Sequence, residues 1–523
     1  MSTVYLIGAG PGDPGLITVR GRECLEAADV VLYDHLVPAR LLRYARADAE
    51  KIDVGVASPQ TAEQDAICYL LVEKAREGKV VARLKWGDPF VFDRGGTEAL
   101  FLHEQGISFD VVPGVPAAIA VPSYAGVPVT YPGAGDTLTF IRGHEDEGRM
   151  QKPSIDWASL ANLDGTIVCY AGPQQLPDIL AALLANGRSA DDDAAIVYDG
   201  TLPTQQTHSG SLQQMAELVE RSGERRPAVL VVGRVAALRE HLRWFDARPL
   251  FGRRILVTRP KDQARELVER LEAMGAEAIE APMIRVEPPD DYGPLDQALA
   301  RIAEFDWVIF TSANAVEAFV DRLLAGPDDL RALKGVKVCV VGPATGDRLA
   351  QYGLKIDLTP AEYRAEAVVR ALTEFTDVRG RKILLPHADI GREVLADELR
   401  RHGAEITEVI AYRTVGTDAD REGEPDIYRM LLERRIDVVT FTSASAVRHF
   451  VRIVGAEPAA DLLATTAVAT IGPVTADAAA LHNIRPTIVP QSYTIAALVD
   501  AIVRHFSQVT EAHSWPTYTP TRR

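Results

Sequence analysis

Cysteine is scarce in this sequence, and long hydrophobic runs are missing. Four cysteines occur in 523 residues, none of them in a C-x-x-C pair, so the sequence offers no disulfide framework and favours a reducing, cytoplasmic setting. No window contains about eighteen consecutive apolar residues, which predicts that no segment spans a membrane. The first residues, MSTVYLIGAG, have the pattern of a strand and lack the basic start and long apolar core of a secretory signal.

Positive charge is in deficit as well. With 56 Lys and Arg against 73 Asp and Glu, the formal net charge is -17, which argues against a broad nucleic-acid surface. This composition still allows a local basic cleft that binds an anionic small molecule. The histidines and cysteines show no metal-ligand spacing, so we predict no metal site.

Short β-branched runs alternate with helical patterns along the whole chain. This alternation predicts an α/β protein with largely parallel sheets. A domain boundary is expected at residues 246–252, where a new strand pattern begins, and residues 509–523 are expected to form a flexible tail. The predicted strands are Val4–Ile7, Val80–Leu84, Thr166–Tyr170, Ala228–Val232, Ile255–Val257, Val308–Phe310, Val338–Val341, Ile383–Leu385 and Val438–Phe441.

The second half of the chain contains an internal duplication. Three sequence blocks recur in the same order about 130 residues apart, which predicts two similar α/β lobes. A cleft between two lobes is a common ligand site. The paired blocks are DWVIFTSANAV at 306–316 and DVVTFTSASAV at 437–447, VGPAT at 341–345 and IGPVT at 471–475, and GRRIL at 252–256 and GRKIL at 380–384.

The first half opens with an acidic glycine loop, GAGPGDPG at residues 8–15, and a second Gly-Asp-Pro loop follows at 87–89. A dinucleotide-binding fingerprint would need glycine where Asp13 stands, and a carboxylate there would repel a pyrophosphate. Two acidic loops suit a ligand with positive charge and no phosphates, such as S-adenosylmethionine. Two tight turns capped by their own aspartates explain the pattern equally well.

The order of motifs in the first half resembles a known family. The motifs G-A-G-P-G-D-P, Y-D-H-L-V, R-L-K-x-G-D-P-F, V-P-G, Y-A-G-V-P, G-H-E and A-L-R-x-x-L-x-W-F follow one another within residues 1–246. Together they resemble the uroporphyrinogen-III C-methyltransferases, within the tetrapyrrole methylase fold. The resemblance implies two subdomains, about 1–125 and 126–246, with S-adenosylmethionine between them, and a homodimer formed through this half.

The same resemblance implies roles for individual residues. It makes Asp34 the base that accepts a proton as a pyrrole carbon is methylated, whereas the residues alone also allow a helix N-cap. The sequence departs from the family pattern at Val56, Trp86 and Ala171, where lysine, glycine and methionine are usual. The implied cofactor-binding residues are Gly10, Pro11, Gly12, Asp13, Trp86, Gly87, Asp88, Val91, Pro116, Ala117, Ala171 and Gly200.

In the second half, the duplicated blocks end strands with hydroxyl residues at points where helices are expected to begin. Ser312 and Ser443 follow apolar runs, and Thr345 and Thr475 follow Gly-Pro pairs. One interpretation is simple N-capping. The other is that helix N-termini from both lobes bind the carboxylates of one ligand.

The second half resembles the uroporphyrinogen-III synthases. The motifs L-V-T-R-P, F-T-S-A-N-A-V, V-V-G-P-x-T, L-L-P-x-A-D-I, A-Y-R-T, F-T-S-x-S-A-V-R and I-G-P-x-T-A occur in order within 250–508. The resemblance implies a two-lobed fold joined by a two-stranded linker, with lobe one at 252–286 plus 416–508 and lobe two at 290–411. The implied reaction closes hydroxymethylbilane to uroporphyrinogen III with inversion of the last ring, without a cofactor.

The synthase resemblance nominates Tyr412 as the proton donor that helps the substrate hydroxyl to leave, although a tyrosine packed at the lobe junction is an open alternative. Both halves would act on polycarboxylate tetrapyrroles in one pathway, which favours a bifunctional enzyme. The alternative is an active synthase fused to a non-catalytic methylase-like binding module. The candidate substrate-binding residues are Arg259, Ser312, Thr345, Arg413, Ser443 and Thr475, with Arg364 as a further charge partner and surface ion pairing as the alternative for the arginines.

Overall fold

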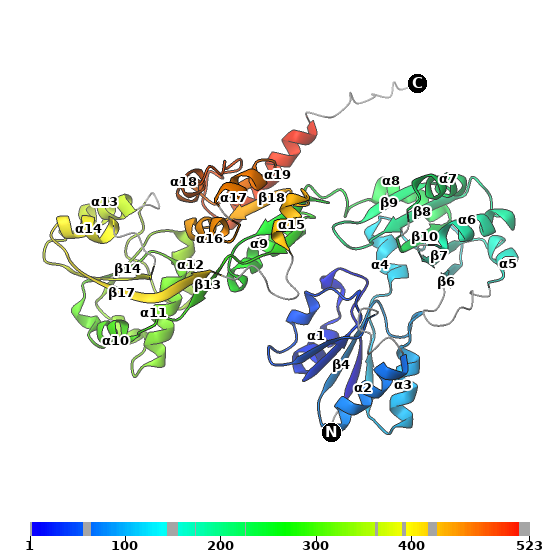
Figure 1. The fold of residues 1–523 in the computed structure, drawn as a ribbon, viewed down its shortest axis with the longest axis horizontal. Coiled ribbons are helices and arrows are strands. Elements are labelled where there is room, and N and C mark those ends of the chain that lie inside the picture. The colour runs from blue at the N-terminus through cyan, green and yellow to red at the C-terminus, as the bar shows by residue number, and fades with distance from the viewer. Residues whose placement is uncertain are drawn as a thin grey trace. The chain divides into compact units, whose positions relative to one another are not determined.

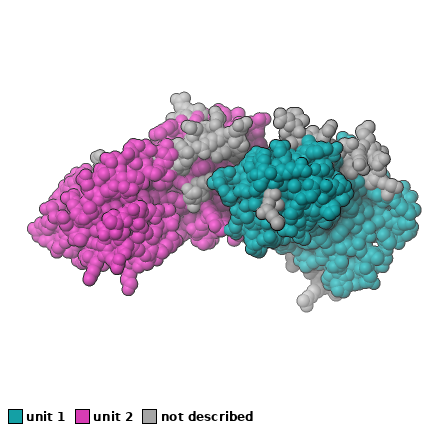
Figure 2. Space-filling model, turned by 90° about the horizontal axis from the view of Figure 1, so that it is seen from below, with its two compact units in different colours: residues 1–252 teal, residues 253–523 magenta. Residues whose placement is uncertain are grey.

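The chain folds into two compact units, Met1–Gly252 and Arg253–Arg523, shown in Figures 1 and 2. The computed structural model describes residues 3–55, 64–143, 155–172, 174–224, 226–360, 365–389, 394–416, 426–454 and 456–511. Both units are α/β, as predicted, and each of the nine predicted strands coincides with a strand of the structure. Within these ranges, no helix is long and apolar enough to cross a membrane.

A five-stranded parallel sheet forms the first part of unit 1, in the order β3-β2-β4-β1-β5. Its central strands are buried on both faces: Val4 and Leu6 pack into one hydrophobic cluster and Ile7 into another. Thr18 caps α1 by accepting a hydrogen bond from Gly21 N–H at 3.0 Å. The elements are β1 Val4–Gly8, α1 Val19–Ala27, β2 Val30–Tyr33, β3 Glu50–Asp53, α2 Gln64–Arg76, β4 Val81–Lys85, α3 Gly95–Glu104 and β5 Phe109–Val112.

The second sheet of unit 1 has the order β6-β7-β10-β8-β9, and only β6 and β7 are parallel. The prediction of largely parallel sheets is therefore wrong here. Hydrophobic clusters cover both faces, so its central strands β7, β8 and β10 are apolar runs whatever their direction, whereas the edge strand β9 is polar. The elements are α4 Ala117–Tyr124, β6 Leu138–Arg142, α5 Trp157–Ala161, β7 Thr166–Ala171, α6 Leu176–Ala185, β8 Asp193–Tyr198, β9 Gln206–Ser211, α7 Leu212–Ser222, β10 Ala228–Val232 and α8 Arg239–Leu242.

Unit 2 contains two sheets, which define its two lobes. Lobe one is the parallel sheet β12-β11-β18-β19, and lobe two is the sheet β13-β17-β16-β14-β15, parallel except for the β13–β17 pair. The strands are β11 Arg254–Val257, β12 Glu277–Glu280, β13 Ile284–Glu287, β14 Trp307–Phe310, β15 Lys337–Val340, β16 Lys382–Ala388, β17 Glu405–Gly416, β18 Val438–Phe441 and β19 Ala467–Thr470.

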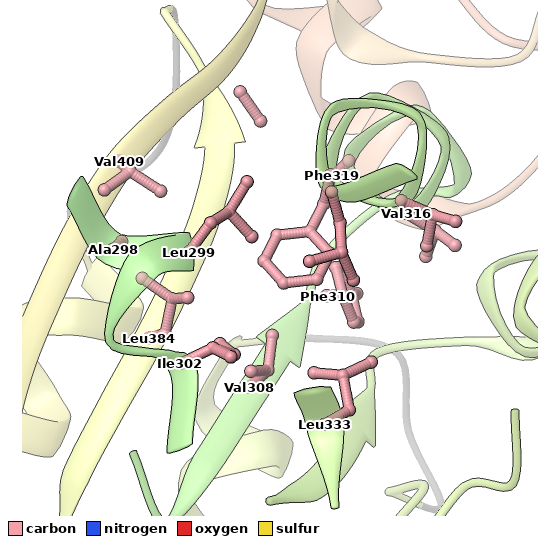
Figure 3. Packing of buried hydrophobic residues seen from close by; sticks show 14 of the residues in the cluster. Ala298, Leu299, Ile302, Val308, Phe310, Val316, Phe319, Leu333, Leu384 and Val409 are labelled. Atoms are coloured by element: carbon pink, nitrogen blue, oxygen red, sulfur yellow. The ribbon is translucent and has the colours of Figure 1, made fainter. Parts of the chain in front are cut away.

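The helices of unit 2 cover these sheets. Figure 3 shows how Phe310 of β14 packs against Phe319 of α11 in the core of lobe two. The last helix continues to Glu511, past the predicted start of a tail at 509. The helices are α9 Lys261–Ala273, α10 Gly293–Ala300, α11 Ala313–Ala325, α12 Pro343–Gln351, α13 Ala365–Phe375, α14 Val394–Arg401, α15 Ile427–Leu432, α16 Ala444–Val454, α17 Ala456–Leu463, α18 Pro473–Ala480 and α19 Ile495–Glu511.

The duplicated sequence blocks occupy equivalent places in the two lobes. The order β12-β11-β18-β19 corresponds strand by strand to β17-β16-β14-β15. Each sequence repeat therefore gives its first two strands to one lobe and its next two to the other. The antiparallel pair of β13 with the end of β17, in which Glu287 lies opposite Arg413, runs between the lobes (Figure 1).

The glycines at the carboxyl ends of β1, β4 and β5 allow a close backbone approach in unit 1. A Cβ atom added at Gly114 would lie 2.2 Å from the Gly87 carbonyl oxygen and 2.6 Å from Gly8 Cα. We expect Gly114→Ala to lower the stability of unit 1 by about 2 kcal/mol or more, measured by thermal denaturation. Gly96→Ala, where nothing lies within 4 Å, is the matched control and should be close to neutral. Equal melting temperatures for the two variants would contradict this packing.

Candidate functional sites

The two acidic loops of unit 1 lie side by side, because β1 and β4 are neighbouring parallel strands. Gly10 N–H donates to the Gly87 carbonyl at 3.1 Å, and Gly87 N–H donates to the Gly10 carbonyl at 2.9 Å. Both glycines have φ values above +70°, a conformation that favours glycine. Two loops distant in the sequence thus form one continuous backbone surface at the carboxyl edge of the sheet.

The aspartates of these loops cap their own turns. Asp13 accepts hydrogen bonds from Gly15 N–H and from the Tyr124 hydroxyl, both at 2.7 Å. Asp88 accepts from Phe90 N–H at 2.8 Å and from Gly114 N–H at 2.9 Å. The hydrogen bonds therefore favour the interpretation that these carboxylates shape the loops, over the interpretation that they point freely at a cation.

The same loops contact the second subdomain of unit 1. Asp13 N–H donates to Thr201 Oγ1 at 3.1 Å, and a Cβ atom on Gly12 would lie 2.7 Å from that oxygen. The indole N–H of Trp86 donates to the Pro11 carbonyl at 3.1 Å. The predicted cofactor residues 10–13, 86–88 and 200 therefore meet at the junction of the two subdomains.

The backbone at Gly87 leaves room for a contacting ligand group on this surface. A Cβ atom on Gly87 would lie 4.0 Å from both Pro116 Cα and Ala117 N, so the space above this glycine is bounded by main chain and by the start of α4. Ligands of α/β proteins commonly bind at this edge of the sheet. Val91 N–H bonds the Asp88 carbonyl at 3.4 Å, which places Val91 on the same loop.

Ala171 is placed differently from the other predicted cofactor residues. Side chains alternate along β7, so Tyr170 faces the cluster that contains Ala117, whereas Ala171 packs with Ile179 on the opposite face of the sheet. A contact of Ala171 with a ligand beside Ala117 would therefore use its main chain. Val56, the other departure from the family pattern in this region, lies outside the described residues.

Asp34 belongs to a buried network of charges. Its Oδ1 pairs with Arg83 Nη2 at 2.5 Å, and its Oδ2 accepts from Trp86 N–H at 3.2 Å. Glu98, which is fully buried, bonds both Arg83 at 3.2 Å and Lys85 at 3.1 Å. The composition of the strand gives a signal for this network, since Arg83 and Lys85 are two residues apart and therefore lie on the same face of β4.

The network keeps Asp34 ionised. Burial alone would raise the pKa of Asp34, but the charges of Arg83 and Lys85 and the hydrogen bonds from Arg83 and Trp86 outweigh it and hold the pKa below its ordinary value. The carboxylate is half-buried, with 27% of its side chain exposed, so it remains accessible from one side. The N-cap interpretation does not apply, because Asp34 bonds strand-end groups of β4 instead of a helix start.

In unit 2, Tyr412 lies in β17 with its ring in the core of lobe two. Its hydroxyl lies 3.1 Å from Ser312 Oγ, and Ser312 also caps α11 by accepting from Ala315 N–H at 3.1 Å. Burial raises the pKa of Tyr412, hydrogen bonds from Ser312 and Asn314 oppose this shift, and the Asp389 charge adds to it. Tyr412 therefore stays protonated at neutral pH, as a proton donor must.

The hydroxyl residues of the duplicated blocks lie at helix starts in both lobes. Ser443 accepts from Ala446 N–H at 3.1 Å, as Ser312 does from Ala315 in lobe two. Thr345 and Thr475 are buried in the first turns of α12 and α18. These contacts establish the capping at the two serines. They are equally compatible with carboxylate binding by the remaining N–H groups of the same turns.

The candidate arginines differ in their surroundings. Arg259 lines a recess of about 310 Å³ together with Gln263 of lobe one and Arg348 of α12 in lobe two, and burial lowers its pKa. Arg413 instead pairs with Glu287 at 3.4 Å and with Asp290 at 2.8 Å. This is the surface ion pairing that the sequence analysis gave as the alternative to substrate binding. Arg364 lies outside the described residues.

Two residues that the sequence analysis did not single out connect the lobes of unit 2. Gln263, in the first turn of α9, donates its side-chain amide to Asn314 Oδ1 of α11. Asn314 lies two residues after Ser312, whose Oγ contacts the Tyr412 hydroxyl. The duplication contains a signal for this site, because Asn314 corresponds to Ser445 in the second copy of the block and is its last variable position.

Comparisons with known proteins agree with this division. The family described as Tetrapyrrole (Corrin/Porphyrin) Methylases matches residues 3–216, and the family described as Uroporphyrinogen-III synthase HemD matches 265–500. The porphyrin biosynthesis protein HemD of Ruminiclostridium josui is 38% identical over 504 residues, which are 96% of this chain and 97% of that protein. The chain therefore belongs to the same family as this HemD protein. It joins a tetrapyrrole methylase domain to a uroporphyrinogen-III synthase domain.

Relatives of the methylase domain alone are also known. The S-adenosyl-L-methionine-dependent uroporphyrinogen III methyltransferase of Methanosarcina barkeri is 44% identical over 240 residues, which are 46% of this chain and 94% of that protein. A solved structure of the uroporphyrin-III C-methyl transferase of Thermus thermophilus, complexed with S-adenyl homocysteine, is 35% identical. It covers 45% of this chain and 100% of its own, with a TM-score of 0.40.

The pKa of Asp34 predicts a specific dependence of stability on pH. In the folded methylase domain the pKa of Asp34 lies below its unfolded value of about 3.9. The ionised carboxylate therefore stabilises the fold above that pH, and this stabilisation is lost as the pH falls through the folded pKa of Asp34. We therefore expect Asp34→Asn to lower the melting temperature at pH 7, with a difference that shrinks as the pH falls below the unfolded pKa and through the folded one. Asp178→Asn, on the exposed side of α6, is the control. A difference independent of pH would argue against an ionised Asp34.

Proposed function

We propose that unit 2 closes hydroxymethylbilane to uroporphyrinogen III with inversion of the last ring, and that unit 1 methylates this product with S-adenosylmethionine towards precorrin-2. The observation that carries the proposal is the placement of one candidate proton-transfer group in each unit. The Asp34 carboxylate, with 27% of its side chain exposed, is bonded to Arg83 and to Trp86 N–H, and the Tyr412 hydroxyl lies 3.1 Å from Ser312 Oγ at the start of α11. Against the effect of burial, the charges of Arg83 and Lys85 lower the pKa of Asp34, whereas burial raises the pKa of Tyr412, as a base and an acid require. The product of unit 2 is the substrate of unit 1.

In unit 2, Tyr412 acts as a general acid. It gives its hydroxyl proton to the departing hydroxyl group of hydroxymethylbilane; the C–O bond breaks, water leaves, the substrate becomes an azafulvenium cation and Tyr412 becomes a phenolate. After ring closure and rearrangement, a pyrrole carbon loses its proton, which restores the Tyr412 hydroxyl. The protein mainly holds the reacting ends together. The groups proposed to bind the substrate carboxylates are Arg259, Ser312, Thr345, Arg413, Ser443 and Thr475.

In unit 1, S-adenosylmethionine supplies a methyl group when bound. Methylation of a pyrrole carbon that already carries a carboxyalkyl chain makes that carbon quaternary and the substrate cationic. The ionised Asp34 both stabilises that charge and accepts the proton that the neighbouring bridging carbon then loses. A carboxylate with a low pKa is sufficient, because a carbon acid next to a cationic pyrrole is strongly acidic. The residues proposed to hold the cofactor are Gly10, Pro11, Gly12, Asp13, Trp86, Gly87, Asp88, Val91, Pro116, Ala117, Ala171 and Gly200.

The proposed setting is the reducing cytoplasm. The four cysteines are buried, and burial raises the pKa of Cys169 and of Cys339 to about 12, which makes both thiols unreactive. The partners are small polycarboxylate tetrapyrroles, and the family resemblance supports self-association through the methylase half. The described residues hold no group of three or more His, Cys, Asp or Glu side chains arranged to bind a metal ion.

One observation favours the alternative of a non-catalytic methylase-like module. Trp86 stands where the family pattern has glycine, and its indole is bonded to the Pro11 carbonyl and packs against the cluster that contains Ala117. A side chain of this size reduces the space next to the backbone surface at Gly87. The alternative therefore predicts that no methyl group is transferred, whether or not the cofactor binds.

The purified chain, supplied with hydroxymethylbilane and methyl-labelled S-adenosylmethionine, distinguishes the two. The proposal expects a labelled precorrin, and uroporphyrinogen III without label would support the alternative. If Trp86 alone blocks the transfer, Trp86→Gly should restore labelling. Formation of uroporphyrinogen I only would refute both.

Single substitutions should separate the two activities. We expect Tyr412→Phe to slow the formation of uroporphyrinogen III by about 100-fold or more, because the general acid is lost. Methylation of supplied uroporphyrinogen III should be unchanged. Chromatography of the III and I isomers measures the first activity, and transfer of the labelled methyl group measures the second.

The reverse pattern is expected for Asp34→Asn. This variant should lose methylation by a factor of about 100 or more and keep its synthase rate, since the amide neither accepts a proton nor offsets positive charge. The Asp178→Asn variant again serves as the control. Retained methylation in Asp34→Asn would remove Asp34 from the mechanism.

A further inference from the structure

Asp13, in the first acidic loop of unit 1, is held by two residues that are distant from it in the sequence. Its Oδ2 accepts a hydrogen bond from the Tyr124 hydroxyl at 2.7 Å, and its main-chain N–H donates to Thr201 Oγ1 at 3.1 Å. These partners are 111 and 188 positions away along the chain. The other carboxylate oxygen of Asp13 accepts from Gly15 N–H within the loop. The two distant bonds therefore fix both the main chain and the side chain of one loop residue.

Gln205 joins the two residues that hold Asp13. Its side-chain oxygen accepts from Thr201 N–H at 2.9 Å, and its side-chain NH2 group donates to the Tyr124 carbonyl oxygen at 3.4 Å. Because Thr201 and Gln205 are buried, with 1% and 3% of their surfaces exposed, water cannot readily replace these bonds. Tyr124, Thr201 and Gln205 thus form a closed ring of hydrogen bonds with Asp13, which we call the Asp13 clamp.

Thr201 is held in a strained backbone conformation. Its φ is +71°, in the left-handed region that β-branched residues rarely adopt. The nearby Asp199 also has a positive φ of +47°, and Gly200 lies between the two residues. Strain of this kind persists only where the surroundings impose it, and it is concentrated at functional sites. Here the bonds to Gln205 and Asp13 hold Thr201 in place and direct its Oγ1 at the loop.

The ring of Tyr124, at the end of α4, is held by aromatic neighbours. Its centroid lies 4.7 Å from that of Phe245 and 5.1 Å from that of Trp244, whose indole N–H donates to the Ser123 carbonyl at 2.9 Å. Burial and the hydrogen bond to Asp13 raise the pKa of Tyr124, so its hydroxyl remains a proton donor at neutral pH. The packed ring therefore presents this donor to Asp13 from a fixed position.

We propose that Tyr124, Thr201 and Gln205 are positioning residues for the cofactor of unit 1, which keep the loop at residues 10–13 in the conformation that receives S-adenosylmethionine. The inference rests on the proposed methylase function of unit 1. A loop that is competent for only part of the time binds its ligand more weakly, in proportion to that fraction. The clamp acts on the loop before the cofactor binds. Its loss should therefore raise KM for the cofactor and leave kcat at saturating cofactor unchanged.

Two substitutions of Thr201 that differ by one hydroxyl test the proposal in the full chain. Thr201→Ser keeps the acceptor for Asp13 N–H, so its dissociation constant for S-adenosylhomocysteine, measured by calorimetry, should stay within about 2-fold of the unaltered chain. Thr201→Ala lacks the acceptor, and its constant should rise by roughly 3- to 10-fold, the range of one neutral hydrogen bond. Both variants lack the same methyl group, so a role in packing alone would affect them equally. Equal constants for the two would overturn the role of Thr201.

Tyr124→Phe supplies an independent measurement. It removes the hydroxyl that bonds Asp13 Oδ2 and keeps the ring beside its aromatic neighbours. Loss of a donor to a carboxylate should raise the dissociation constant by about 10-fold or more. KM for S-adenosylmethionine should rise in parallel, whereas kcat should change little. Tyr69→Phe, on the exposed side of α2, is the matched control and should bind as the unaltered chain does.

The outcomes distinguish the inference from the proposed function. If the unaltered chain does not bind S-adenosylhomocysteine, the proposed methylase function is refuted and the inference with it. If the unaltered chain binds and Thr201→Ala and Tyr124→Phe bind equally well, only the inference is refuted. A lowered kcat with unchanged KM in both variants would also overturn it. Thermal denaturation checks that the variants are folded, and Tyr124→Phe decides the question if Thr201→Ala does not fold.

Discussion

Parallel strands end together at one edge of a sheet, and this constraint gathers every candidate site of the chain. In unit 1 the ends of β1, β4 and β5 bring the loops at Gly10, Gly87 and Gly114 into backbone contact. In unit 2 the strand ends lead directly into capped helices at Ser312 and Ser443. Most candidate residues therefore lie in short segments that follow strands, with Tyr412 inside β17 as an exception, and the strands hold these segments in place.

Both units tune one ionisable group by the balance between burial and neighbouring charges. Asp34 is partly buried but has Arg83 and Lys85 beside it, so the attraction of two cations exceeds the cost of desolvation. Tyr412 is buried beside neutral hydrogen-bonding groups and the like charge of Asp389, so desolvation dominates. The same physical terms thus favour an ionised carboxylate in one unit and a protonated phenol in the other, the states that the proposed base and acid need.

The sequence predicted the strands well because buried strands form continuous apolar runs, but it could not predict their order or direction. An apolar run does not show whether a strand is parallel or antiparallel to its neighbours. The prediction of parallel strands was therefore wrong for the sheet that contains β7, β8 and β10. The aspartates at 13 and 88 were found from their spacing, yet their hydrogen bonds to Tyr124 and Gly114 depend on tertiary contacts. The bond between Gln263 and Asn314 joins different lobes, and local pattern carries no information about such a pair.

The interleaved repeats of unit 2 impose an order on its folding. The strands of lobe two, β13 to β17, are contiguous in the chain. In lobe one, β11 pairs with β18, and the paired residues Ile255 and Val438 are separated in the sequence by the whole of lobe two. During synthesis on the ribosome, lobe two is completed before β18 exists, and the central pairing of lobe one closes a long loop afterwards. A folded lobe two shortens that loop by holding its ends near each other, so the inserted lobe acts as a scaffold for the one that encloses it.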